Sequence, residues 1–183
     1  MKFIPQKIPD VLLIIPKIHS DERGYFMESF RKDLLEDFLG KKIEFIQDNE
    51  SKSSLGVLRG LHYQLPPYAQ SKLVRVISGS VLDIVVDIRK DSPTYGQHLS
   101  IELNSENQYQ LFIPQGFAHG FVVKSDEAIF SYKVDKQYEP NFERGFVFDD
   151  KSLKIDWTLS RDLIQVSQKD ILLPEFSDLS SPF

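Results

Sequence analysis

Residues 72–89, KLVRVISGSVLDIVVDIR, predict two β-strands separated by a tight turn. Valine and isoleucine make up much of both halves, and β-branched residues favour strands. The Ser-Gly-Ser at 78–80 between the halves is a turn signal, since glycine readily adopts the positive φ that many tight turns require. We therefore expect strands over 72–78 and 81–89.

The same composition and alternation recur along the chain, so β-structure is predicted to dominate. Further strands are expected at 24–30, 42–49, 57–64, 98–103, 108–113, 119–123, 128–134 and 145–149. Many short strands separated by turn residues are typical of a sandwich or a closed barrel.

Helical spacing is clear only at 31–40, where four apolar residues share one face and Gly40 can cap the C-terminus. The tail after residue 150 mixes proline, serine and short apolar pieces, and is expected to form helical turns against the barrel. Because the sequence has no linker, repeat or low-complexity tract, we expect a single domain over 1–183.

Composition limits the class of protein. A chain of 183 residues with 41% hydrophobic and 27% charged residues matches one globular domain. It has no cysteine, which excludes disulfides and thiolate metal sites and suits a reducing compartment. The net charge of −5 argues against a general nucleic-acid binder. The apolar run at 11–15 is too short for a signal peptide, and no stretch reaches the roughly 20 residues of a membrane span, so a soluble, cytoplasmic protein is expected.

Two polar residues interrupt the predicted strand at 57–64, VLRGLHYQ. Arg59 has apolar neighbours on both sides, and an arginine that points inward needs an anion such as a phosphate. Strict alternation would place Arg59 and His62 on opposite faces. Both serve one pocket only if the strand is irregular, and Gly60 is where we expect a bulge. The alternative is that both are structural polar residues satisfied within the protein.

The remaining candidate residues also have ordinary explanations. His62 and His119 each lie in a β segment close to a glycine and are interpreted as site residues, whereas His19 and His98 are interpreted as ordinary polar residues. Solvent exposure would explain Lys72, Lys169 and Asp170, and core packing beside Phe130 would explain Tyr132. Tyr138 would either stack on a flat base or cap the barrel.

Several segments together resemble the dTDP-4-dehydrorhamnose 3,5-epimerases, a family of cupin-type enzymes that act on sugar nucleotides. They are DERGYFMESF, QDNESKS, VLRGLHYQ, KLVRVISGSVLDIVVDIRKDSPTYG, IPQGFAHGF and SYKVDKQYEP, in that order over most of residues 10–175. The resemblance implies a mainly β, cupin-type jelly-roll β-barrel with a few short peripheral helices. It also implies an epimerase that inverts C3 and C5 of dTDP-4-dehydro-6-deoxy-D-glucose to give dTDP-4-dehydro-L-rhamnose, in dTDP-L-rhamnose biosynthesis. Ser71 stands where the family often has glycine, which is a minor departure.

Carried over position by position, the resemblance assigns His62 as the proton-abstracting base, Asp170 as its carboxylate partner, Tyr132 as the proton donor and Lys72 as the cation beside the sugar carbonyl. It assigns substrate contacts to a larger set, in which Tyr138 stacks on thymine and Asp83 supports His119. That set is Arg23, Phe26, Glu28, Gln47, Asp48, Asn49, Arg59, Lys72, Asp83, His119, Tyr138, Glu143 and Lys169.

The chemistry of such a substrate agrees with these assignments. The C3 and C5 protons are both α to the ketone, so removing either one forms an enolate that an ammonium or another donor stabilises. Histidine suits the base because its ordinary pKa lies near neutrality, and a carboxylate partner would fix its tautomer. Inversion also requires an acid on the opposite face of the sugar, a role that Tyr132 can fill.

Three other functions are compatible with parts of this pattern. A single-centre epimerase of a related dTDP-4-keto-6-deoxy sugar would use the same residues, and a sugar-nucleotide-binding barrel would not need a complete base and acid. A metal-dependent cupin oxygenase would need a second histidine or a glutamate soon after His62, which the sequence lacks, so no metal and no cofactor are expected. The resemblance further implies a homodimer with exchanged N-terminal strands; we expect no nucleic-acid or membrane partner.

Overall fold

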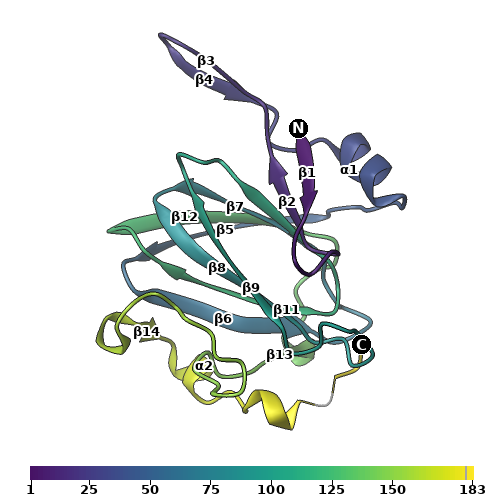
Figure 1. Cartoon of the computed structure of the whole chain (residues 1–183), viewed down its shortest axis with the longest axis vertical. Helices are drawn as coiled ribbons and strands as arrows, with labels where there is room; N and C mark the ends of the chain where they lie inside the picture. Colours follow the sequence, from purple (N-terminus) through teal and green to yellow (C-terminus); the bar gives the residue numbers. More distant parts are fainter. Residues whose placement is uncertain (180) are drawn as a thin grey trace.

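The computed structural model describes residues 1–179 and 181–183, and two sheets dominate them (Figure 1). In the first sheet the strands follow the order β1 (Lys2–Pro5), β2 (Leu12–Ile15), β10 (Gln110–Ile113), β7 (Lys72–Ser78), β12 (Glu127–Val134) and β5 (Gln47–Ser54). In the second the order is β13 (Glu143–Gly145), β6 (Val57–Gln64), β11 (Phe117–Val123), β8 (Ser80–Asp87) and β9 (His98–Asn104), with β14 (Gln165–Val166) parallel to β6. The sheets enclose one core, which confirms the predicted cupin-type jelly-roll barrel.

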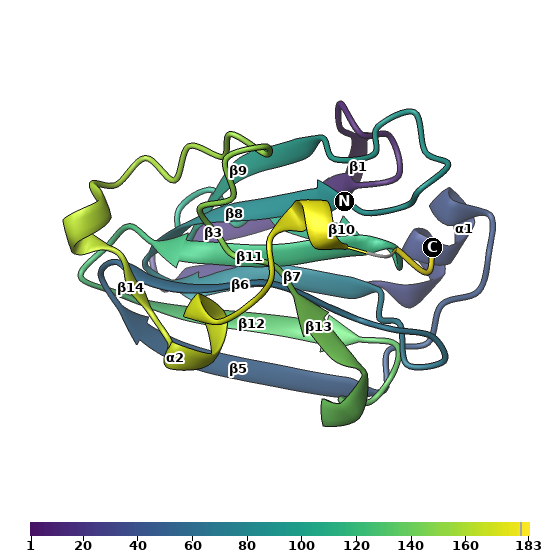
Figure 2. The ribbon, with the colours of Figure 1, turned by 90° about the horizontal axis from the view of Figure 1, so that it is seen from below.

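Helical structure is short and lies at the periphery, as predicted. Helix α1 (Lys32–Leu39) ends at Gly40, whose φ of 64° is the left-handed conformation that glycine adopts without strain. The C-terminal tail contains 3₁₀ turns at Arg161–Leu163 and Phe176–Asp178 around the short helix α2 (Gln168–Ile171), and another 3₁₀ turn lies at Pro140–Phe142. Figure 2 shows this tail lying over the outer face of the second sheet. No helix among the described residues is long and apolar enough to cross a membrane.

Strand β8 is buried along nearly its whole length because both of its faces are covered. Val81 and Val85 belong to the cluster between the two sheets. Leu82 and Ile84 point the other way, into a second apolar cluster under the C-terminal tail. This double coverage explains why the sequence of β8 is almost continuously apolar, and it holds the inward-facing Asp83 in the barrel interior.

Several strand predictions differ from the structure, and the short strands β3 (Ile18–Asp21) and β14 were not predicted. The strand expected at 42–49 starts later and runs through the polar stretch to Ser54, because β12 pairs with it over its full length. The strand expected at 145–149 is instead Glu143–Gly145, where it pairs with β6. The strands β1 and β2 were not predicted, since their apolar residues become a strand signal only through pairing with each other and with β10.

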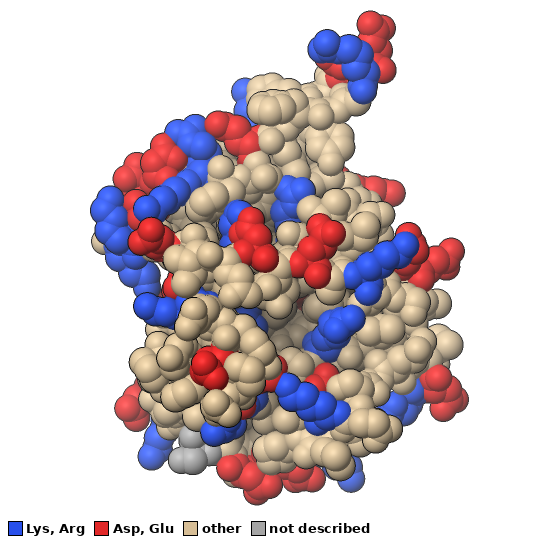
Figure 3. Space-filling view, turned by 180° about the vertical axis from the view of Figure 1, so that it is seen from behind, with Lys and Arg blue, Asp and Glu red and all other residues tan. Residues whose placement is uncertain are grey.

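A two-stranded hairpin, β3 (Ile18–Asp21) with β4 (Gly24–Met27), projects from the barrel (Figure 1). Its aromatic side chains are largely exposed, Tyr25 at 58% and Phe26 at 68%. An ion pair of 2.5 Å joins Arg23 to Asp21 near its tip, where charges of both signs are visible in Figure 3. Among the described residues, a single hydrogen bond joins this hairpin's side chains to the barrel, from the Gln108 amide to the Tyr25 hydroxyl at 3.3 Å.

Strand β6 contains the predicted irregularity at Gly60. On β11, His119 pairs with His62 and Phe121 pairs with Arg59, so two residues of β11 span three residues of β6. The extra residue in β6 is a bulge, and Gly60 has a φ of 130° that favours glycine. Leu58 and Leu61 consequently pack in the outer cluster while Arg59 and His62 both turn to the inside. The Gly60–Leu61 peptide bond is cis, as is Pro66–Pro67.

The core between the sheets should respond strongly to loss of volume. Leu111 on β10 is fully buried in that cluster, and it does not line the large pocket described below. Leu111→Ala is expected to lower the free energy of unfolding by about 2–5 kcal/mol, from lost burial plus the cavity left behind. Chemical denaturation measures this, with Leu172→Ala as the control because Leu172 is 80% exposed. Equal losses in the two variants would contradict the assignment of Leu111 to the core.

Candidate active site

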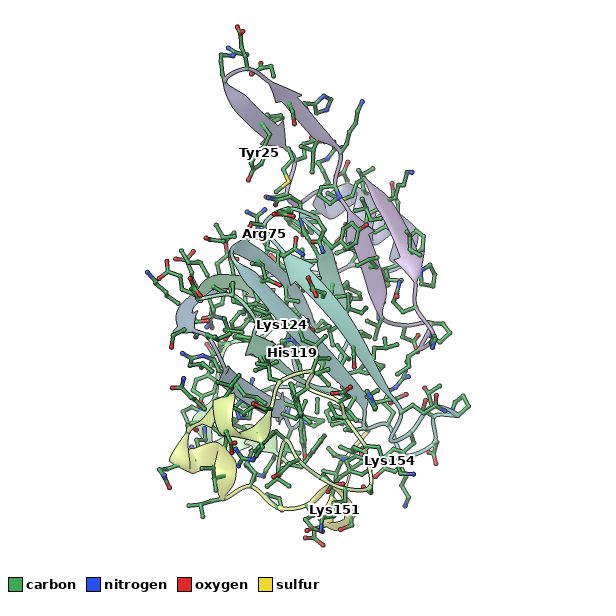
Figure 4. The ribbon with its side chains drawn as sticks, turned by 60° about the vertical axis from the view of Figure 1, so that its left-hand side comes forward. Tyr25, Arg75, His119, Lys124, Lys151 and Lys154 are labelled. Atoms are coloured by element: carbon green, nitrogen blue, oxygen red, sulfur yellow. The ribbon has the colours of Figure 1, made fainter. Side chains whose placement is uncertain are left out.

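A pocket of about 570 Å³ opens between the two sheets of the barrel. Its walls come from β5, β6, β7, β11, β12 and β13 and from the segment around α2. Many residues predicted for the site line it together: Asn49, Arg59, His62, Lys72, His119, Tyr132, Glu143, Lys169 and Asp170. Figure 4 shows His119 among the barrel strands.

The first element of the site is a histidine–aspartate pair. His62 Nε2 lies 2.7 Å from Asp170 Oδ1, and because a carboxylate can only accept, Nε2 is the donor of this hydrogen bond. Asp170 is buried on α2, and its backbone N–H donates to the Ser167 hydroxyl at the start of that helix. Burial would raise the pKa of Asp170, but the hydrogen bond and charge of His62, helped by the Gly60 N–H and Ser167, lower it below its usual value. Asp170 is therefore a carboxylate that orients His62.

A second histidine–aspartate pair lies beside the first. His119 Nε2 is 2.9 Å from Asp83 Oδ2, and both residues are buried. Asp83 lies behind His119 and is not part of the pocket lining, and its other oxygen has no hydrogen-bond partner among the described residues. Burial raises the pKa of Asp83, although His119 and Lys72 oppose the shift. His119 also faces His62 directly in the β6–β11 ladder.

Lys72 is the cation at the floor of the site. Burial lowers its pKa to about 8, and the charges of Asp83 and Glu143 oppose that shift only in part. Some of the residue remains accessible from the pocket, to whose wall it belongs. At neutral pH the side chain is therefore an ammonium that is poorly solvated and close to losing its proton.

Tyr132 reaches the pocket from the sheet opposite His62. It lies on β12, whereas His62 lies on β6 of the other sheet. Burial raises the pKa of the Tyr132 hydroxyl, with Arg59 opposing the shift and Glu143 adding to it. Phe130 two residues earlier is fully buried, so Tyr132 continues the inward-facing row of β12 and ends it with a hydroxyl at the pocket.

Arg59 supplies a second positive charge. Its Nε donates to the Ser53 hydroxyl at 3.2 Å, and within residues 1–179 and 181–183 it forms no ion pair. The mouth of the pocket carries one further cluster, in which Glu143 accepts a hydrogen bond of 2.8 Å from the Tyr138 hydroxyl and pairs with the Lys169 ammonium. These contacts leave Arg59 available to an anion inside the pocket.

The structure does not bring every predicted residue to this pocket. Asp48 pairs with Lys133 on the outer face of the first sheet, since β-alternation puts Asn49 and Tyr132 inside and their neighbours outside. Gln47 instead bridges Asn49, at 2.7 Å, and the backbone N–H of Tyr138. Arg23 and Phe26 lie on the projecting hairpin and Glu28 just after it, outside their own chain's pocket; in Figure 4 Tyr25 of the hairpin stands far from His119.

Other lining residues had no clear sequence signal. Phe121 and Phe130, whose ring centroids lie 4.2 Å apart, line the pocket, and so do the polar residues Ser51, Gln165 and Ser167. Serine and glutamine at these positions read as ordinary surface residues. Pairing with β12 is the signal that could have identified Ser51 and Ser53 as inward-facing, because they lie opposite the apolar Phe130 and Ala128. No group of three or more His, Asp or Glu side chains suited to a metal is present in the described part of the chain.

Comparisons with known proteins give matches along nearly the whole chain. The profile of the dTDP-4-dehydrorhamnose 3,5-epimerase family matches residues 5–178. The chain is 54% identical to the dTDP-4-dehydrorhamnose 3,5-epimerase of Shigella flexneri over 97% of each chain. Among solved structures, it is similar to that of Elizabethkingia anophelis, with a TM-score of 0.94, 44% identity and 97% of each chain covered. It is also similar to the Legionella pneumophila dTDP-6-deoxy-D-glucose-3,5-epimerase solved with dTDP-4-keto-L-rhamnose, with a TM-score of 0.93, 45% identity, and 97% of this chain and 94% of that chain covered.

The pKa of Lys72 can be measured directly. Because burial penalises the charged form, we expect Lys72 to lose its proton at about pH 8, whereas an ordinary lysine holds it to about 10.5. Between these values the unfolded chain binds the extra proton, so the cost of burying Lys72 is full below pH 8 and is relieved as the pH rises. NMR titration of the Lys72 Cε resonance, assigned with Lys72→Met, gives the midpoint, and a midpoint near 10.5 would contradict the buried ammonium.

Proposed function

This chain belongs to the dTDP-4-dehydrorhamnose 3,5-epimerase family, and we propose that it inverts C3 and C5 of dTDP-4-dehydro-6-deoxy-D-glucose to give dTDP-4-dehydro-L-rhamnose. The reaction serves dTDP-L-rhamnose biosynthesis, and we place the enzyme, a single domain over 1–183, in the cytoplasm. The observation that carries the proposal is a pocket with a carboxylate-oriented histidine on one sheet and a tyrosine on the other. Nearly full-length similarity to proteins named for this activity supports it.

His62 is the base in the proposed mechanism. Its Nε2 donates to Asp170, so Nδ1 is free to accept the proton from a carbon next to the ketone. The imidazolium that forms is stabilised by the ionised carboxylate, whose lowered pKa keeps it from taking the proton itself. Removal of each α proton leaves an enolate whose negative charge resides mainly on the ketone oxygen.

Lys72 is assigned to that developing charge. Its buried ammonium has lost most of its hydration, so an adjacent enolate oxygen gains more from it than from a solvated lysine. Tyr132 then returns a proton to the carbon from the side opposite His62, since the two residues approach from facing sheets. The raised pKa of the tyrosine keeps the hydroxyl protonated before it acts.

The remaining charges suit the nucleotide diphosphate. Arg59 and His119 line the inner wall with donors, and Lys169 and Tyr138 stand at the mouth, where the tyrosine ring can stack on thymine. Glu143 holds Tyr138 and Lys169 together at the entrance through the hydrogen bond and ion pair described above. Gln47 and Asn49 lie at the same end of the pocket as Tyr138, and their side-chain amides can form hydrogen bonds with thymine.

The active enzyme is proposed to be a homodimer in which hairpin β3–β4 of each chain completes the partner's pocket. The hairpin exposes Tyr25 and Phe26 and holds Arg23 outside its own pocket. A two-stranded ribbon is at best marginally stable alone, so a covering partner accounts for its exposed aromatic residues. Arg23, Phe26 and Glu28 would then act in trans.

His62 and Tyr132 should separate the two halves of the reaction. His62→Ala removes the base, so turnover should fall by at least roughly 10²–10⁴ and neither C3 nor C5 should exchange its proton with solvent. Tyr132→Phe keeps the ring but removes the acid, so enolate formation should continue and return of the proton should occur from the original side. NMR of the sugar recovered from D₂O measures both isotope uptake and inversion.

The outcomes distinguish the alternatives. Parent enzyme that incorporates deuterium at both C3 and C5 supports the full reaction, and deuterium at one centre alone identifies a single-centre epimerase. A parent that binds the sugar nucleotide without exchanging either proton would be a binding protein. Inversion by Tyr132→Phe at the parent rate would remove Tyr132 from the mechanism.

Mixed dimers test the exchanged hairpin. Arg23→Ala should weaken substrate binding by an amount typical of a charge-assisted contact, on the order of 1.5–3 kcal/mol. When Arg23→Ala and His62→Ala chains are refolded together, one pocket of each mixed dimer contains an intact base and an intact Arg23, so activity should rise above that of either variant. His62→Ala mixed with Tyr132→Phe is the matched control, because both residues line the pocket of their own chain and exchange of hairpins cannot restore an intact pair. Equal activity in both mixtures would contradict exchange.

A further inference from the structure

Three glycines from three neighbouring strands meet at the bulge that carries Arg59 and His62. They are Gly60 on β6, Gly120 on β11 and Gly145 on β13. A Cβ placed on Gly60 would lie 2.5 Å from the Gly120 Cα and 2.9 Å from the His119 carbonyl oxygen. The strands therefore approach each other more closely here than any side chain would allow.

Gly120 touches the Arg59 end of the bulge. A Cβ on Gly120 would lie 2.7 Å from the Arg59 carbonyl oxygen and 3.0 Å from the Gly60 Cα, both of which are backbone atoms. The φ of Gly120 is not in the left-handed region, so space rather than conformation excludes a side chain. Any larger residue would push the backbone of Arg59 away from β11.

Gly145 touches the His62 end. A Cβ there would lie 2.4 Å from the Leu61 carbonyl oxygen and 3.2 Å from His62 Cδ2 on the imidazole ring. Next to it, Phe146 and Leu61 exchange backbone hydrogen bonds of 3.2 and 3.4 Å, which fix β13 against the bulge. Gly145 itself pairs with His62 in the β6–β13 ladder. A side chain at 145 would therefore move the ring that Asp170 holds at 2.7 Å.

We propose that Gly120 and Gly145 are positioning residues that fix the two ends of the bulge separately. Gly120 sets the place of Arg59, and Gly145 sets the place of the His62 ring. The inference rests on the proposed function, in which Arg59 binds the diphosphate and His62 abstracts the proton. It follows that substrate binding and proton abstraction can be damaged independently from two backbone positions outside the pocket lining.

The test compares Gly120→Ala with Gly145→Ala. A misplacement of about 1 Å at a reacting group costs on the order of 10²-fold in rate. Gly145→Ala is therefore expected to lower kcat by roughly that factor with little change in KM. Gly120→Ala is expected to raise KM, and the Kd for dTDP measured by calorimetry, toward the values of Arg59→Ala while kcat is largely retained. A general loss of stability would not divide between the two constants in this way.

Gly79→Ala is the matched control. Gly79 lies in the turn between β7 and β8, where a Cβ would meet the Glu127 carbonyl oxygen at 2.1 Å and the Ser125 hydroxyl at 2.5 Å, and it is not part of the pocket lining. This variant should lose stability as the others do and keep both kinetic constants. Equal changes of kcat and KM in all three variants would overturn the proposal.

Two readouts do not depend on turnover. The NMR resonances of the His62 imidazole ring should move in Gly145→Ala and stay in place in Gly120→Ala, because only the side chain at 145 meets the ring, and the dTDP affinity should show the reverse. If Gly145→Ala does not fold, Gly120→Ala still decides, because a fall in kcat at unchanged dTDP affinity would overturn the separation. A parent protein that binds dTDP yet leaves the sugar unchanged refutes the enzyme function, while these two readouts continue to judge the role of the glycines.

Discussion

One extra residue in β6 places the proposed diphosphate contact and the proposed base in the same cavity. A regular strand would send Arg59 and His62 to opposite faces. The bulge keeps Leu58 and Leu61 in the outer apolar cluster while both polar side chains turn inward, so the fold does not sacrifice core packing to build the site. The close approach of β11 and β13 at glycines holds this arrangement, and the tail can then bring Asp170 to His62.

A second constraint is the charge inside the barrel. Burial disfavours the charged forms of both Asp83 and Lys72. The charge of each residue favours ionisation of the other and so opposes this effect. Removing one of such a pair leaves a buried charge without compensation, which is far more destabilising than the pair is stabilising. Their value lies in the site: an ammonium that is poorly hydrated and a histidine held by a carboxylate are both ready for an anionic substrate. These poorly hydrated groups can therefore stabilise the enolate and the phosphates more strongly than the same groups could in a solvent-filled cleft.

Much of this could be predicted from the sequence, and the exceptions have physical reasons. The strands at 57–64 and 72–78, the helix near 31–40 and the irregularity at Gly60 follow from local patterns, because each depends on neighbouring residues.

The extension of β5 through Ser51 and Ser53 could not be predicted in this way, because pairing with β12 and burial against the barrel decide it. Asp170 has no local signal at all, and only the return of the tail to β6 makes it the partner of a histidine 108 positions earlier. The roles assigned to individual side chains came from resemblance, and the structure adds which of them share one cavity.

The position of the hairpin β3–β4 connects the assembly of the protein to its chemistry. In its own chain the hairpin contributes nothing to the pocket, and its aromatic side chains face solvent. If it served only to hold two chains together, apolar residues would suffice, yet Arg23 lies in the turn of the same hairpin and is paired only with the nearby Asp21 in the described chain. An arginine with a local acidic partner stays ordered and hydrated until a stronger anion replaces that partner, which a diphosphate can do.

On the proposed exchange, each pocket receives from the other chain both an aromatic surface and a further positive charge, so a monomer would hold the base and the acid but bind the nucleotide poorly. Dimerisation would then act on substrate binding rather than on proton transfer, because His62, Asp170 and Tyr132 all belong to one chain.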